Sequence, residues 1–255
     1  MINKNSFAGL IYGFLFVLAF SSCTQHRPAG SPVLDKKAFV LASQAKAMNQ
    51  HIIASKGTGW ARVETKTKTD TFKIAWAAVF PNKIRITFLI SGNPVETIIA
   101  TGEKIIFFSH TGEHSKYEYN SKDPDMSDYI KVPIKMSEMI LILLGRLPVK
   151  TFDNAYFSPS DASLSSISLE KNRMGVIQLL QFNDKGKIDG LKSADRSGKF
   201  LYEIKVTQYK TYDFGQLPVT MEIKNMDNQR LILDITRFQA NPAIKEDVFR
   251  LTESG

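Results

Sequence analysis

Residues 71–90 read TFKIAWAAVFPNKIRITFLI, which is two apolar runs separated by a short polar break. Aromatic and β-branched residues, which favour strands, are frequent in both runs. Pro81-Asn82-Lys83 has the composition of a turn, because proline and asparagine adopt turn conformations at little cost. The stretch therefore predicts a β-hairpin in which residues 72–80 pair with residues 84–90.

The same pattern of short apolar runs and turn residues continues along most of the chain. Beyond the hairpin, strands are expected at 95–100, 104–109, 115–119, around Ala155, and at 164–170, 174–182, 187–194, 200–209, 217–225 and 230–238. Consecutive strands joined by short turns predict an antiparallel sheet with one buried and one exposed face.

Two segments have helical patterns instead. Apolar residues at helical spacing predict a helix from Asp35, as its N-cap, to about Ala54, with Gly57 and Gly59 ending it. Residues 136–144 form a short, very apolar segment that ends at Gly145. Such helices must bury their apolar surface, so we expect a mainly antiparallel β fold with helices (α+β), in which the helices cover the concave face of a curved sheet.

Composition limits the classes of function. The 255 residues have a formal net charge of +8 and a single cysteine, which excludes an internal disulfide. Net positive charge suits anionic partners, but the basic residues are scattered and no run exceeds two. A mixed-sign, solvated surface is the favoured interpretation, and no nucleic-acid partner is expected.

The N-terminal segment has the pattern of a secretory signal. Lys4 precedes an uncharged run at 7–20, which is shorter than the roughly 20 residues needed to cross a bilayer. Phe20-Ser21-Ser22-Cys23 resembles a bacterial lipobox, in which the cysteine receives a diacylglyceryl thioether and cleavage precedes it. The alternative is an ordinary signal peptide with an incidental cysteine.

The lipobox resemblance gives the expected organisation and location. Residues 1–22 would be a lipoprotein signal peptide, 23–34 the lipidated Cys23 and a flexible tether, and 35–255 the folded domain. Thr24 stands where an aspartate would favour retention in the inner membrane. We therefore expect a lipid-anchored protein of the bacterial cell envelope, on the inner leaflet of the outer membrane and facing the periplasm.

Residues 35–251 resemble the LolA/LolB-like lipoprotein-localisation family, and the resemblance implies an incomplete, half-open β-barrel with helices covering its concave face. Three stretches carry the resemblance: the hairpin Phe80-Pro81-Asn82-Lys83-Ile84-Arg85-Ile86, the segment from Val132-Pro133-Ile134 to Leu147-Pro148, and the end of the chain from Ile235 through Asn241-Pro242 to Leu251. The lipobox makes LolB the nearer relative. LolB exposes a leucine on a loop between early strands, whereas the matching turn here, Ser91-Gly92-Asn93-Pro94, has none.

The resemblance implies a hydrophobic cavity that holds acyl chains of lipoproteins or lipids and assists outer-membrane lipoprotein localisation. The implied partners are those acyl chains, the membrane through Cys23, and a periplasmic carrier protein. The candidate lining residues are Leu89, Phe107, Ile140, Leu141, Leu144, Ile177, Leu179 and Phe182. The alternatives are that these residues fill a closed core, and that the protein is a structural or assembly lipoprotein using the fold as a protein-interaction module.

Arg85 is a further candidate, since a guanidinium near the cavity mouth can donate to lid carbonyls or to a lipid headgroup. A solvated strand arginine is the simpler alternative.

No enzymatic, metal or cofactor site is expected. His110-Thr111-Gly112-Glu113-His114 matches the H-x-x-E-H pattern of zinc proteases, but that pattern requires a helix. The glycine between two strand-like runs favours a turn instead. No catalytic residue or cofactor is predicted.

Overall fold

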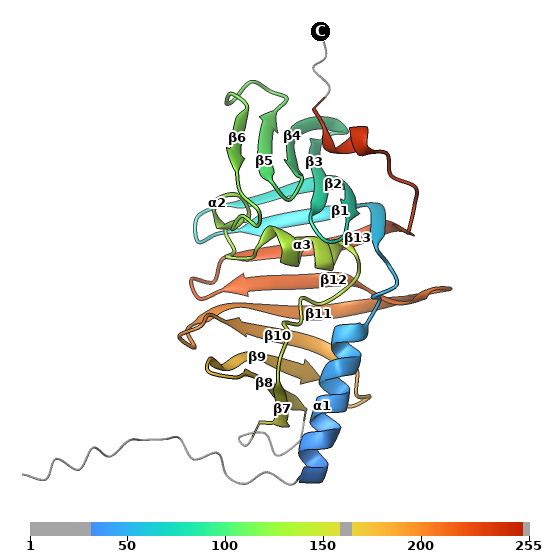
Figure 1. Cartoon of the computed structure of the whole chain (residues 1–255). Coiled ribbons are helices and arrows are strands. Elements are labelled where there is room, and N and C mark those ends of the chain that lie inside the picture. The colour runs from blue at the N-terminus through green and yellow to red at the C-terminus, as the bar shows by residue number, and fades with distance from the viewer. Residues whose placement is uncertain (1–31, 159–164, 252–255) are drawn as a thin grey trace, which may run out of the picture. The chain divides into compact units, whose positions relative to one another are not determined.

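A single antiparallel sheet organises the residues that the computed structural model describes, 32–158 and 165–251 (Figure 1). Its 13 strands lie in the order β6-β5-β4-β3-β2-β1-β13-β12-β11-β10-β9-β8-β7. The strands are β1 Ala54–Glu64, β2 Thr69–Val79, β3 Lys83–Ile90, β4 Asn93–Ala100, β5 Lys104–Ser109, β6 Tyr117–Asn120, β7 Asn154–Phe157, β8 Ser166–Lys171, β9 Gly175–Phe182, β10 Ile188–Ala194, β11 Phe200–Tyr212, β12 Gly215–Asn225 and β13 Arg230–Ala240.

The hairpin predicted from residues 71–90 is confirmed as β2 and β3. Val79 pairs with Lys83 across the turn, and Trp76 pairs with Ile86 further along. The alternation of this hairpin places Ile74, Trp76 and Ile86 on one buried face. Local hairpins of this kind build each half of the sheet in sequence order.

The two halves meet where the first strand pairs with the last. β1 pairs with β13 over Ser55 to Glu64, although nearly the whole domain separates them in sequence. β6 and β7, at the two ends of the strand order, are not paired with each other, so the sheet stays open. The fold is therefore a half-open barrel with helices, as predicted.

The helices lie against the sheet. They are α1 Pro32–Ala47, α2 Ser127–Ile130, α3 Met136–Leu143 and the 3-10 turn η1 Glu246–Phe249. In Figure 1, α3 lies in front of the middle of the sheet and α1 runs beside its lower strands. α3 buries five of its eight residues, which explains its nearly uniform apolar sequence.

The first helix differs from the prediction at both ends. It begins at Pro32 rather than Asp35, and it ends at Ala47 rather than near residue 54. Gly57 and Gly59 lie inside β1 and do not end the helix. A Cβ on Gly57 would lie 2.2 Å from the Trp76 ring, so a glycine at this position lets the ring pack directly against the backbone of β1.

The connection between α1 and β1 is fixed by polar side chains. Asn49 takes a left-handed conformation with φ of 56°, and its amide donates to the carbonyls of Gly145 and Gln216. Arg146, which is buried and follows α3 in the chain, donates to the carbonyls of Asn49, Gln50 and Ile52. These tertiary bonds end α1 early, because they compete with the next helical turn for the same backbone groups.

Two apolar cores occupy opposite faces of the sheet. The large core joins the helices to the concave face. The small core lies on the other face, where Phe249 of η1 covers Ala77, Ile99 and Ile106. Among the described helices, none is long and apolar enough to span a membrane.

Candidate functional site

A largely apolar cavity of about 480 Å³ lies on the concave face beside α2; we call it the α2 cavity. It is lined by Val63, Phe72, Phe88, Glu96, Ile98, Phe107, His114, Tyr117, Asp128, Tyr129, Ile130 and Lys131. The sheet contributes most of this wall and α2 with its flanking residues contributes the rest. The volume falls in the range of about 300–1,000 Å³ that is usual for small-molecule sites.

Aromatic rings make the wall of the α2 cavity. The Phe107 and Tyr129 rings stack with centroids 3.6 Å apart, which joins β5 to α2. Phe72 and Phe88 meet edge to face at 5.6 Å on the neighbouring strands. Partial burial raises the pKa of Tyr129 to about 12, so its hydroxyl stays neutral at physiological pH. Such a wall favours apolar ligands, because it has few polar groups that would lose hydrogen bonds to water when a ligand covers it.

Four ionisable side chains besides tyrosine line this cavity, and two of them, Glu96 and His114, pair with each other. The His114 Nδ1 donates to the Ser115 carbonyl at 2.7 Å, and its Nε2 lies 2.9 Å from the Glu96 carboxylate. Only the imidazolium can donate to both acceptors. The Ser115 carbonyl first, and the Glu96 carboxylate in addition, raise the pKa of His114. Lys131 donates to the Asp128 carbonyl at 2.7 Å.

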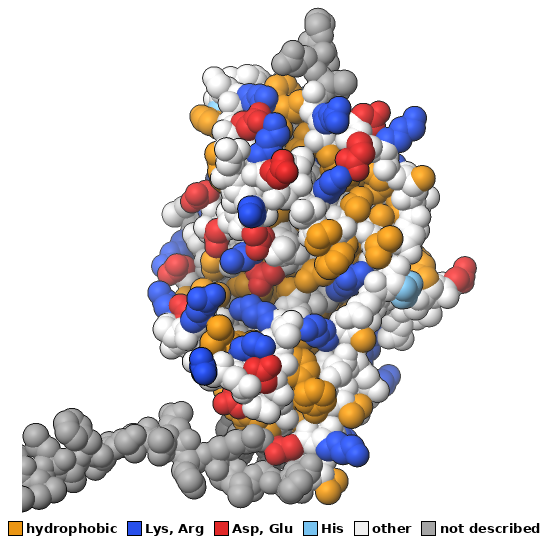
Figure 2. Space-filling model, viewed as in Figure 1, with side chains coloured by type: hydrophobic (Ala, Val, Ile, Leu, Met, Phe, Trp, Pro, Cys, Tyr) orange, Lys and Arg blue, Asp and Glu red, His pale blue; other side chains and the backbone are white. Residues whose placement is uncertain are grey.

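A second concave-face cavity, of about 470 Å³, lies at the N-terminal end of α3; we call it the Lys150 cavity. It is lined by Asp125, Pro133, Lys135, Glu138, Lys150, Thr151, Lys171, Met174, Ile177, Ala194, Asp195, Arg196 and Leu201. Burial lowers the pKa of Lys150. Acidic and basic side chains intermingle over the face that carries α3 (Figure 2).

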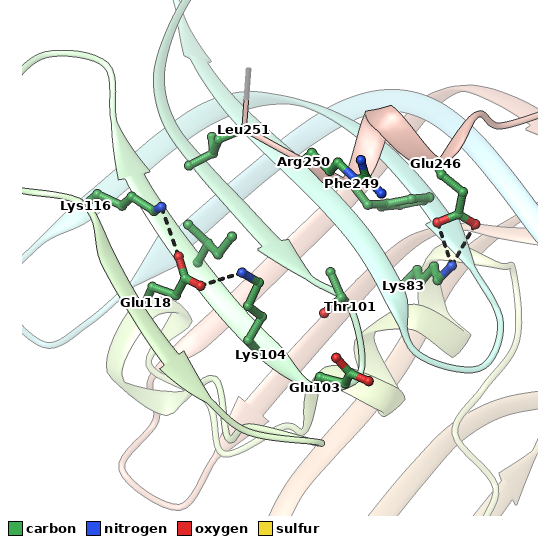
Figure 3. A pocket seen from close by; sticks show the side chains of 11 residues that line it. Lys83, Thr101, Glu103, Lys104, Lys116, Glu118, Glu246, Phe249, Arg250 and Leu251 are labelled. Atoms are coloured by element: carbon green, nitrogen blue, oxygen red, sulfur yellow. Dashed lines mark hydrogen bonds and ion pairs between the residues drawn. The ribbon is translucent and has the colours of Figure 1, made fainter. Parts of the chain in front are cut away.

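A polar pocket of about 530 Å³ lies on the opposite face of the sheet, beside η1 (Figure 3). Each of its three lysines has a carboxylate partner. Lys83 pairs with Glu246 at 2.7 Å, and Lys104 and Lys116 share Glu118. The wall of this pocket is therefore a network of charged side chains, unlike the apolar wall of the α2 cavity.

The eight predicted lining residues do not form one wall. Phe107 lines the α2 cavity and Ile177 lines the Lys150 cavity. Ile140, Leu144 and Phe182 are buried in the large core, and Leu141 is half-buried on α3.

Leu89 and Leu179 belong to the other face of the sheet. Leu89 pairs with Lys73, out of phase with the inward Ile74 and Phe88. Leu179 pairs with Lys192 and is likewise out of phase with the buried Leu180. The prediction for these two leucines was wrong because side chains alternate between faces along a strand, and a shift of one residue moves a side chain to the opposite face.

Arg85 also lies on the opposite face, where it contacts the C-terminal segment. Its Nη1 donates to the carbonyls of Val248 and Arg250 at 3.2 and 3.3 Å. The predicted bond to backbone carbonyls is present, but the carbonyls are those of η1 and the following residues and not those of a lid over the concave cavities.

His110 and His114 lie in the connection between β5 and β6, as the turn prediction required. They do not share a ligand: His110 bonds Thr97 at 2.9 Å, while His114 bonds Glu96. Within residues 32–158 and 165–251, no group of three or more His, Cys, Asp or Glu side chains could hold a metal ion. The predicted signal segment and Cys23 lie outside the described residues.

Most residues of the α2 cavity were not predicted from sequence. Val63, Phe72 and Phe88 come from three strands, and nothing local shows that they share a space with α2. One signal was present for Phe88, since it is in phase with Ile84 and Ile86 along the strand.

Comparison with solved structures identifies the architecture. A domain named as an outer membrane lipoprotein-sorting protein from Vibrio parahaemolyticus superimposes with a TM-score of 0.56 at 10% identity, covering 84% of this chain and 97% of that one. A LolA superfamily protein from Nitrosomonas europaea gives 0.55 at 10% identity with the same coverages.

The chain has the LolA-like fold. A DUF1329 family protein from Desulfovibrio piger shares it with a TM-score of 0.52 at 7% identity, covering 85% of this chain and 97% of that one. No family model matches the sequence, and no curated protein matches it. The LolA-like fold was thus retained at sequence identities too low for function to be transferred with it.

Proposed function

We propose that this protein binds acyl chains of lipoproteins or lipids in the α2 cavity and assists lipoprotein localisation in the bacterial cell envelope. The observation that carries the proposal is the concave cavity of about 480 Å³ with aromatic and aliphatic walls. Each buried methylene of an acyl chain contributes about 0.8 kcal/mol, so such walls retain aliphatic chains in preference to polar ligands.

The fold supports this role by analogy. Its structural neighbours include proteins named for lipoprotein sorting and for the LolA superfamily. The His114–Glu96 pair suits a binding protein, because these two groups satisfy each other and most of the remaining cavity wall is apolar. The role is one of binding and transfer, with no chemical step assigned to the chain.

We further propose that Cys23 anchors the protein to the outer membrane through a lipid, facing the periplasm. The anchor would keep the domain within a short tether's reach of the bilayer, where a periplasmic carrier could deliver cargo. Metabolic labelling with a palmitate analogue should mark the wild-type protein and not Cys23→Ser. Equal labelling of the two would contradict the anchor without affecting the cavity.

Blocking the α2 cavity tests the binding function. Val63 is half-buried on β1 and lines the cavity, so Val63→Trp should fill it and lower the affinity for a fluorescent fatty acid at least tenfold. The matched control is Ile90→Trp, because Ile90 is 52% exposed at the end of β3 and lies outside the cavity.

Native mass spectrometry of the full-length protein purified from cell membranes supplies the second measurement. Bound lipid or acylated peptide should leave the protein when Val63→Trp is introduced and remain with Ile90→Trp. Unchanged binding in Val63→Trp would refute the assignment to this cavity. An absence of lipid together with a trapped envelope protein on crosslinking would favour the interaction-module alternative.

A further inference from the structure

The Lys150 cavity contains an ammonium group that no carboxylate among the described residues contacts. The Lys150 ammonium donates to the Ser193 hydroxyl at 2.9 Å and to the Ala194 carbonyl at 3.1 Å, both neutral acceptors. Within the described part of the chain it forms no ion pair with a carboxylate. A half-buried charge without a counter-ion is costly unless something else pairs with it.

The nearest carboxylates are committed elsewhere. Glu138 accepts a bond from the Lys135 backbone N–H at 3.0 Å and so caps α3. Asp195 accepts bonds from the backbone N–H groups of Ser197 and Lys199 at 2.8 and 3.0 Å. Both acids act on Lys150 electrostatically, but neither contacts its ammonium.

The other cavity lysines differ from Lys150. Lys171 pairs with Asp153 at 2.8 Å, and Lys135 lies 3.9 Å from Asp123. Among the described residues, Lys150 is therefore the lysine of this cavity that is partly buried and has no carboxylate partner.

The position of Lys150 is built into the fold. Gln178 of β9 is 1% exposed, and its amide accepts from the Lys150 backbone N–H at 2.7 Å and donates to the Pro148 carbonyl at 2.9 Å. A buried amide that bonds the chain on both sides of Val149 fixes where the lysine side chain begins. Beside it, the fully buried Tyr202 hydroxyl has no partner with hydrogen-bond geometry among the described residues.

Apolar side chains line the same cavity as the Lys150 ammonium. Pro133, Met174, Ile177, Ala194 and Leu201 line the same space of about 470 Å³. Met174 is 38% exposed and lies toward solvent, whereas Ile177 is buried. A ligand that satisfies both parts of this surface must have an anionic group joined to an apolar chain.

We propose that the Lys150 cavity is a second binding site, which takes an amphipathic anion whose carboxylate or phosphate pairs with the Lys150 ammonium and whose apolar chain lies against Met174, Ile177 and Leu201. The site differs from the α2 cavity in its residues and in the charge of its ligand. A variant that blocks the α2 cavity, Val63→Trp, should leave it intact.

Three probes of equal chain length separate the contributions. Hexanoate, hexyl phosphate and hexanol are titrated into the full-length protein in detergent, with lysine labelled by ¹³C at Cε. The Lys150 signal is assigned by its absence from Lys150→Gln or, if that variant does not fold, from Lys150→Arg. Hexanoate or hexyl phosphate should shift this signal saturably, and hexanol should not; the preferred anion distinguishes a free carboxylate from a lipid phosphate.

Two variants complete the experiment. Lys150→Gln should weaken anion binding at least tenfold. Lys187→Gln should leave it within twofold, because Lys187 is also partly buried but lies over the Tyr209 ring, outside the cavity. Equal affinity for hexanol and hexanoate, or no saturable shift with either anion, would overturn the proposal. That wild-type result decides the question even if Lys150→Gln does not fold.

Discussion

The α2 cavity and the Lys150 cavity have nearly the same volume, about 480 and 470 Å³, but they distribute charge differently. In the α2 cavity His114 pairs with Glu96, and Lys131, which donates to the Asp128 backbone carbonyl, is exposed to solvent. In the Lys150 cavity an ammonium lies half-buried with only neutral acceptors.

The two cavities therefore favour different ligands, although both lie on the concave face of the sheet. Where aromatic rings from β2, β3 and β5 meet α2, the surface excludes water and favours aliphatic ligands. Where the segment after α3 crosses β9 and β10, backbone and amide groups hold a lysine against the core. The sheet is common to both, so the connecting segments decide the character of each cavity.

The largest expected effect on this comparison comes from Phe107→Ala. Phe107 is 1% exposed and stacks on Tyr129, so its removal leaves a void in the core and in the cavity wall. The free energy of unfolding should fall by about 3–5 kcal/mol. Chemical denaturation measures it, with Phe108→Ala as the neighbouring, half-buried control. A loss no larger than that of Phe108→Ala would mean that α2 is not held by this stack.

A smaller effect, confined to the other cavity, is expected for Gln178→Leu. This change keeps the volume but leaves the Pro148 carbonyl and the Lys150 N–H without their partner. Each unpaired buried group costs about 1–3 kcal/mol, and the bond to the Lys150 N–H is only partly buried, so the unfolding free energy should fall by about 2–4 kcal/mol. Gln181→Leu, on the opposite face of β9, is the control.

Gln178→Leu should also weaken hexanoate binding while leaving fatty-acid uptake by the α2 cavity unchanged. Equal losses of affinity at both cavities would show that the two sites are not independent.

The smallest effect concerns the rim of the α2 cavity. Because the folded-state pKa of His114 is raised, its contribution to stability is complete below the unfolded value of about 6.5 and is lost as the pH rises through the folded value. Glu96→Gln should lower the NMR titration midpoint of His114 and leave the core intact. An unchanged midpoint would mean that the Ser115 carbonyl alone accounts for the shift.

The sequence predicted the strands well, because the signals for them are local. The β2–β3 hairpin and the helix at 136–143 follow from alternation, turn residues and a continuous apolar run. The end of α1 was not predictable in this way. Asn49 and Arg146 fix it through bonds to residues about 100 or more positions away.

The sequence placed few of the residues that line the two cavities. Phe107 and Ile177 were assigned to a cavity and do line one, whereas Leu89 and Leu179 lie on the other face. Hydrophobicity alone does not distinguish the two faces, because the small core under Phe249 makes part of the outer face apolar as well. Lys150 carried no sequence signal, since its burial depends on Gln178 and Ser193 from later strands.

By itself, the sequence determined an antiparallel sheet with covering helices, since periodicity and turn chemistry act between neighbours in the chain. The tertiary structure alone decided which face is concave, where α1 ends and how the two cavities differ. These depend on the pairing of β1 with β13 and on hydrogen bonds between distant segments, whose energies exist only once the chain has folded.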